Sequence, residues 1–242
     1  MWKLRKIALA YFIEKGLKMK REVDLKEISD GNLYGPNDMV KADCGDCKGC
    51  SACCQGMGES IVLDPCDVYR LTKGLNVSFE ALLEDKIELN VFDGMILPNL
   101  KMSGASEACA FLNEEGRCSV HSIRPGICRL FPLGRVYENG GFQYFLQIHE
   151  CKNENRTKVK VKKWIDTPDL KQNDQFVLAW HDFVEEIQDK MMQVADDALF
   201  KKVNMFLLQQ FYIERYHEED FYTQFDERLK KAKAVVASLI NA

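Results

Sequence analysis

The sequence lacks an apolar run that could cross a membrane, because no window approaches the roughly 18 uninterrupted apolar residues that a transmembrane helix requires. The apolar run at residues 7–13 is followed by Glu14 and Lys15, and no small-residue cleavage site comes after it. These features predict an amphipathic first helix rather than a secretory signal. We therefore expect no membrane span and a cytoplasmic location, where thiols stay reduced.

An excess of positive charge is also lacking, since the net charge is -4 and the isoelectric point is near 5.7. This balance provides no general attraction to nucleic acid or anionic membranes, and we expect no nucleic-acid partner. One local basic stretch alternates Lys158, Lys160 and Lys162 with valines, which predicts a strand with lysines on one face. A solvated edge strand protected by lysine explains this stretch, and a site for an acidic partner is the alternative.

Several enzyme motifs are missing, namely the G-x-G-x-x-G loop, the P-loop, H-E-x-x-H and the nucleophile elbow. The catalytic residues are therefore unknown, and whether the protein is an enzyme stays open. Glycine and proline are both absent after Pro168, which predicts two or three helices from about Gln172 to the end. An apolar stripe at helical spacing is expected to face the core of this region: Phe176, Trp180, Phe183 and Ile187.

Local signals place short helices and hairpins before this region. Asp64 is expected to cap a helix that begins at Pro65, and Ser78 is expected to cap another. Asp93-Gly94 and Asn139-Gly140, each between apolar segments, predict tight hairpin turns. The sequence thus predicts a helix-rich α+β fold with small β-hairpins.

The composition predicts three segments along the chain. Residues 1–40 are expected to form a basic helix and a lead-in loop that contains Asp30, Gly31, Gly35 and Pro36. Residues 41–155 are expected to form an irregular, metal-bound cysteine-cluster domain, and residues 156–242 a C-terminal helical subdomain.

What the sequence has in abundance is cysteine, with ten residues, five of them between Cys44 and Cys54. An even count would suit disulfides in a secreted protein, but the length and the tight spacing favour metal binding. Cys44, Cys47, Cys50 and Cys54 have the C-x2-C-x2-C-x3-C spacing of a bacterial ferredoxin, although Gln55 stands where proline normally follows.

Two further features bear on how the thiols would be arranged. Adjacent side chains diverge in extended backbone, so Cys53 and Cys54 are expected to serve different centres. One of them would then face a downstream group that consists of Cys109, Cys118, Cys128 and Cys151. Arg124 and Arg129 flank Cys128 and could donate hydrogen bonds to cluster sulfurs, or could form surface salt bridges.

Several ordered motifs carry a resemblance to a known family: C-x2-C-x2-CC from Cys47, CAFL from Cys109, GRCSV around Cys118, and RPGICRLFP from Arg124. Together they resemble the YkgJ-like cysteine-cluster family, a zinc- or iron-chelating domain, over roughly residues 44 to 151. Asp67 and Arg70 match its acidic and basic positions, and His121 stands where it often has tyrosine. The resemblance leaves Cys44 and Cys66 unassigned and implies these metal ligands: Cys47, Cys50, Cys53, Cys54, Cys109, Cys118, Cys128 and Cys151.

The sequence allows more than one metal and more than one function. The ferredoxin-like spacing favours at least one 4Fe-4S cluster over zinc, in one or two metal centres. The first function is a redox or electron-transfer protein with an unknown partner protein. Flagellin lysine N-methylases carry a similar cysteine cluster, so the resemblance also allows an S-adenosylmethionine-dependent lysine N-methylase-like enzyme. The third alternative is a zinc-stapled structural or interaction module.

Overall fold

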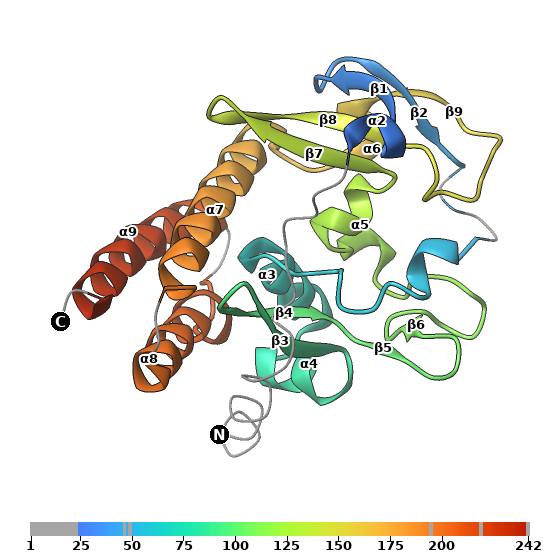
Figure 1. The fold of residues 1–242 in the computed structure, drawn as a ribbon. Coiled ribbons are helices and arrows are strands. Elements are labelled where there is room, and N and C mark those ends of the chain that lie inside the picture. Colours follow the sequence, from blue (N-terminus) through green and yellow to red (C-terminus); the bar gives the residue numbers. More distant parts are fainter. Residues whose placement is uncertain (1–23, 46, 48–49, 194–195, 218–219, 241–242) are drawn as a thin grey trace. The chain divides into compact units, whose positions relative to one another are not determined.

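The computed structural model describes residues 24–45, 47, 50–193, 196–217 and 220–240. It confirms a mixed fold of helices and small antiparallel sheets, with helices at the C-terminal end (Figure 1). The predicted N-terminal helix lies outside the described residues. Within the described ranges, no helix is long and apolar enough to span a membrane.

The chain divides into two compact units, each built from segments that are distant in sequence. Of the described residues, unit 1 comprises those within 62–99 and 179–240. Unit 2 comprises those within 24–61 and 100–178.

Unit 1 begins with the two capped helices that the sequence predicts. Asp64 caps α3 (Pro65–Leu75) by accepting a hydrogen bond from the Asp67 backbone N–H at 2.8 Å, and the Asp67 carboxylate accepts in return from the Asp64 N–H at 3.3 Å. This reciprocal pair is a capping box. Ser78 caps α4 (Phe79–Asp85) by accepting from the Ala81 N–H at 3.2 Å.

Both predicted hairpins are confirmed, one in each unit. Strands β3 (Ile87–Phe92) and β4 (Met95–Leu100) meet at Asp93-Gly94, while β7 (Leu133–Glu138) and β8 (Gly141–Gln147) meet at Asn139-Gly140. All four turn residues have positive φ, between 45° and 83°. A two-residue turn of this kind matches the twist of the flanking strands, which is why Asn-Gly and Asp-Gly favour it.

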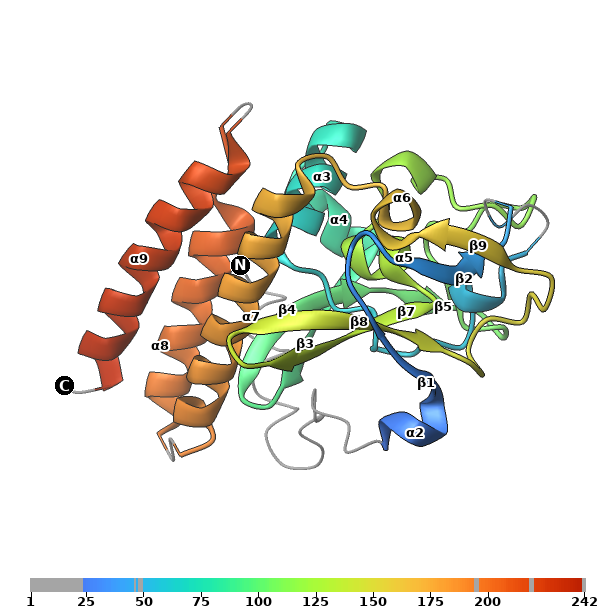
Figure 2. The same cartoon turned by 90° about the horizontal axis from the view of Figure 1, so that it is seen from above.

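Three long helices form the C-terminal region: α7 (Leu170–Met191), α8 (Asp197–Leu208) and α9 (Phe221–Ile240). They lie side by side, and a π-helical segment, η3 (Gln209–Ile213), follows α8 (Figure 2). The predicted apolar stripe is buried, with its members between 0% and 9% exposed. In unit 1, Trp180, Phe183, Phe211 and Phe225 pack their rings together, with centroids 5.0 to 6.2 Å apart.

Unit 2 is built on small sheets. Strand β8 lies between β1 (Ser29–Tyr34) and β7, and β2 (Met39–Asp43) pairs with β9 (Thr157–Lys160). The short helices α5 (Gly126–Leu130) and α6 (Val161–Ile165) complete its core. The core consists of Val40, Ala42, Leu130, Leu133, Tyr144, Leu146, Val161 and Ile165.

Two local expectations for unit 2 are corrected. Strand β1 occupies part of the segment in which Asp30 and Gly31 predicted a loop, because it pairs with β8 through Leu33 and Tyr34. The lysine strand ends at Lys160, since the buried Val161 begins α6, so Lys162 lies on a helix. Lys158 and Lys160 are exposed, as the edge-strand interpretation requires.

Candidate metal centre

Nine of the ten cysteines lie in unit 2, and the tenth, Cys66, is buried on α3 of unit 1. All ten are free thiols. Eight of the nine in unit 2 are half-buried, whereas Cys109 is 9% exposed. Cys66 is therefore a core residue of α3, whereas all eight predicted metal ligands belong to unit 2.

The cysteines in the described part of the run that follows β2 lie in tight turns rather than in a strand. Cys47 has φ 54°, and the Cys50 N–H donates to the Cys47 carbonyl at 3.1 Å. Cys53 and Cys54 lie in a single 3-10 turn, η1 (Ala52–Cys54). Successive turns of this kind point several side chains toward a small region, which a straight strand cannot do.

The expected divergence of Cys53 and Cys54 assumed extended backbone, and the structure corrects that premise. The two residues share a 3-10 turn, and a hydrogen bond between their side chains is the main reason that the pKa of the Cys53 thiol lies well above its usual range. Two centres therefore no longer follow from this pair, and metal stoichiometry has to decide their number.

Three further thiols have raised pKa values, and those of Cys118 and Cys151 link the run to distant cysteines. Burial, the Cys44 thiol at 3.3 Å and the Cys53 thiol raise the pKa of Cys47 to about 12. Burial raises the pKa of Cys118, and Cys53 adds to the rise. Burial likewise raises the pKa of Cys151, with contributions from Cys44 and Cys50.

The remaining predicted ligands are placed by the backbone. Cys109 lies on β6 (Ala108–Cys109), which pairs with β5 (Met102–Ser103), and Ala108 forms a β-bridge to Gln55, directly after the run. Cys118 forms a bridge to Leu112. Cys128 lies on α5. Of these three segments, the one with Cys109 is thus paired directly to the end of the run. No three Cys, His, Asp or Glu side chains of the described residues are grouped as metal ligands would be.

Arginines surround the thiols and supply positive charge. Arg124 lowers the pKa values of Cys47, Cys53 and Cys118, and its guanidinium lies 2.8 Å from His121 Nε2. By contrast, the buried Arg129 donates to the backbone carbonyls of Arg124, Ser122 and Asp166. Its predicted contact with cluster sulfurs stays a prediction.

Two cations near the thiols were missed in the sequence. Arg117 donates to the Cys47 carbonyl at 2.8 Å and lowers the pKa of Cys118, its neighbour in the sequence. Arg156 lowers the pKa of Cys151, five residues before it. Of these two arginines, only Arg117 could have been recognised from the sequence, because it directly precedes a cysteine.

Unsatisfied guanidinium nitrogens test whether this site suits an anionic centre. Nε of Arg124, and Nε and Nη1 of Arg156, are buried without a hydrogen bond to any described residue. Buried donors normally have partners, and a centre held by several thiolates carries negative charge and acceptor sulfurs. The donor set therefore fits a thiolate-bound metal or iron–sulfur centre.

Comparison with known proteins gives one match. Residues 46–164, just under half of the chain, match the model of the CxxCxxCC family, described as a putative zinc- or iron-chelating domain. No curated protein and no solved structure gives a significant match. The matched segment begins after Cys44 and contains all eight predicted ligands.

Proposed function

Since residues 46–164 belong to the CxxCxxCC family of zinc- or iron-chelating domains, we propose that this segment holds a 4Fe-4S cluster and exchanges electrons with a partner protein. The proposal is carried by one observation, the set of half-buried thiols beside two arginines with buried, unpartnered nitrogens. Half-buried ligands would leave the centre near the surface, where a partner can approach it. The ferredoxin-like spacing from Cys44 to Cys54 supports iron–sulfur over a single ion.

The chain's own residues would hold and tune this centre. When bound, the cluster would supply one-electron exchange. Four thiolates, drawn from the run and from Cys118 and Cys151, would bind it. Of these thiols, Cys47, Cys118 and Cys151 have raised pKa values and must first lose a proton. Arg124 and Arg156 would offset the thiolate charge and hydrogen-bond to sulfur, which stabilises the more reduced, more negative state.

One observation favours zinc as the second candidate. The sulfurs of Cys44 and Cys47 are 3.3 Å apart. Two thiolates on one tetrahedral zinc ion, each about 2.3 Å from the metal, are separated by about 3.8 Å. The pair is thus close to the spacing of two ligands of one ion, which supports a zinc-stapled structural or interaction module.

Metal analysis after anaerobic purification tests the proposal. We expect iron and sulfide, a visible absorption band that dithionite bleaches reversibly, and an EPR signal in the reduced protein. Cys47→Ser should lower the iron and sulfide content, whereas Cys66→Ala, a matched change in unit 1, should not. Stoichiometric zinc without sulfide would overturn the redox function and support the zinc module. Binding of S-adenosylmethionine would support the methylase alternative.

A further inference from the structure

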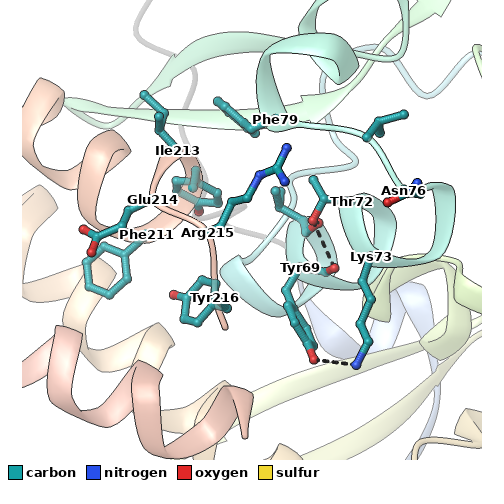
Figure 3. Close-up of a pocket in the computed structure, with 13 residues that line it drawn as sticks. Tyr69, Thr72, Lys73, Asn76, Phe79, Phe211, Ile213, Glu214, Arg215 and Tyr216 are labelled. Carbon is teal, nitrogen blue, oxygen red and sulfur yellow. Dashed lines mark hydrogen bonds between the residues drawn. The ribbon is translucent and has the colours of Figure 1, made fainter. Parts of the chain in front are cut away.

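Unit 1 contains a pocket of about 280 Å³, and none of its lining residues is a predicted metal ligand. One wall is the face of α3 with Tyr69, Thr72 and Lys73, and Phe79 follows from the start of α4. The other wall is η3 and the segment after it, up to Tyr216 (Figure 3). The volume is slightly below the range of about 300 to 1,000 Å³ typical of ligand pockets, so it suits a small molecule.

A buried arginine holds one wall of this pocket in place. Arg228 of α9 is 8% exposed and donates to the backbone carbonyls of Gln210, Glu214 and Arg215 at 2.7 to 2.9 Å. Its guanidinium also stacks on the ring of Tyr216, 3.8 Å from the centroid. The segment that leaves the π-helix is therefore fixed before any ligand binds, and π-helical segments are frequent at functional sites.

Two of the three charged residues that line the pocket, Lys73 and Arg215, are positive, and the third is Glu214. Figure 3 shows Arg215 pointing toward the side formed by Phe79 and Thr72, whereas Glu214 points to the opposite side. Arg215 is exposed, and its side chain forms no hydrogen bond or ion pair with any other described residue. Lys73 adds a second cation, placed 3.1 Å from the Tyr69 hydroxyl.

Two acidic groups near this pocket are already engaged. Asp64 and Asp67 cap the N-terminal end of α3. Both also act on Arg70, where burial would lower the pKa of the guanidinium but the nearby Cys66, Asp67, Tyr222 and Asp64 raise it. Their charges also reach the lining, where Asp64 and Asp67 help to raise the pKa of Tyr212 and Asp64 helps to raise that of Tyr216.

A buried polar atom completes the lining. The Tyr216 hydroxyl is buried and makes no hydrogen bond of ordinary geometry to a described residue, although the Arg228 guanidinium beside it lowers the pKa of Tyr216 against the larger effect of burial. Such a group is costly unless a ligand or water satisfies it. Half-buried Val77 and Ile213 supply apolar contact in the lining, whereas Phe79 and Phe211, 3% and 0% exposed, belong to the core behind it.

From these features we propose that the pocket binds a small organic anion, with an apolar or aromatic body and one carboxylate or phosphate group. The guanidinium of Arg215 can form two parallel hydrogen bonds to such a group, and Lys73 adds charge. The body would lie against the half-buried side chains of Val77 and Ile213, and its polar edge would approach Tyr216.

Titration of the full chain with phenyl phosphate, followed by ¹H–¹⁵N NMR or calorimetry, tests this site. We expect saturable binding with shifts in α3 and residues 209–216, and at least tenfold weaker binding of benzyl alcohol, which lacks the charge. Arg215→Met should weaken binding about tenfold, as loss of a charge-assisted hydrogen bond predicts. Lys233→Met, an exposed change on α9 outside the pocket, should leave binding unchanged.

A second variant separates binding from folding. Tyr216→Phe removes the unsatisfied hydroxyl, so the melting temperature of the free protein should stay the same or rise while phenyl phosphate binds several-fold more weakly. Absence of saturable binding, equal binding of benzyl alcohol, or unchanged affinity in Arg215→Met would overturn the proposal. Circular dichroism of each variant confirms that it is folded.

Discussion

Asp174 of unit 2 is a partly buried carboxyl whose charge works against folding. Burial raises its pKa above the ordinary value of 3.8, although the Tyr144 hydroxyl, which donates to it at 3.2 Å, and Arg135 oppose the rise. A carboxyl with a raised folded-state pKa contributes stability that is fully present below its unfolded pKa. That contribution is lost as the pH rises through the folded pKa.

Asp174→Asn therefore has a pH-dependent effect of predictable sign. We expect the stability of the variant, relative to the unchanged protein, to improve as the pH rises above about 3.8, because asparagine carries no charge to desolvate. Urea unfolding of both proteins across pH values from about 4 to 7 measures the difference. A stability difference that stays constant over this window would show that Asp174 does not titrate as described.

At the same scale, single residues show what a sequence can and cannot reveal about the site. The clustered thiols and Arg124 were identifiable because they form short patterns. Arg129 is adjacent to Cys128 and thus nearer to it in the sequence than Arg124, yet it donates to backbone carbonyls. The direction of a long side chain depends on the tertiary environment of its element, and adjacency in sequence does not fix it.

The two hairpins allow a matched experiment on one type of turn. Gly94 and Gly140 occupy equivalent positions, with φ of 83° and 71°. An added Cβ at Gly94 would lie 3.0 Å from the Met191 Cβ, whereas at Gly140 it would meet nothing within 4 Å. Both substitutions incur conformational strain, but only Gly94→Ala adds overlap with the neighbouring helix.

We expect Gly140→Ala to cost about 1–2 kcal/mol, because an L-residue is strained in the left-handed region. Gly94→Ala should cost about 2–4 kcal/mol, since overlap in a packed site adds to that strain. Hydrogen exchange of the two hairpins, measured separately by mass spectrometry, reports the loss in each unit. Equal losses would mean that α7 shifts to accommodate the methyl group.

Elements with strong local signals were predictable from the sequence, and others were not. Capped helices such as α3 and Asp-Gly or Asn-Gly hairpins encode their own ends. Strand β1 was missed because its residues favour turns, and only pairing with β8 makes it a strand. The η1 turn at Cys53-Cys54 was missed for a different reason. No local sequence pattern distinguished this turn from extended backbone.

At the scale of the whole molecule, the metal-free and metal-bound proteins should respond to pH in opposite directions. The raised pKa values of Cys47, Cys53, Cys118 and Cys151 keep these thiols protonated at neutral pH without metal. Ionising a buried thiol is unfavourable, so the metal-free chain should lose stability as the pH rises above about 9, the ordinary thiol pKa. Metal binding reverses the sign, because it needs the thiolates.

Zinc titration measures this reversal directly, whichever metal the protein holds in the cell. Each ligand thiol releases one proton, so the apparent zinc affinity should rise about tenfold per pH unit for every proton released. Calorimetry in buffers of different ionisation enthalpy counts the protons, and a four-thiolate site should release about four. Cys47→Ser should lower the count by about one and Cys66→Ala should not change it. An affinity independent of pH would show that the thiols of unit 2 are not the ligands, because zinc binds thiolates and not protonated thiols.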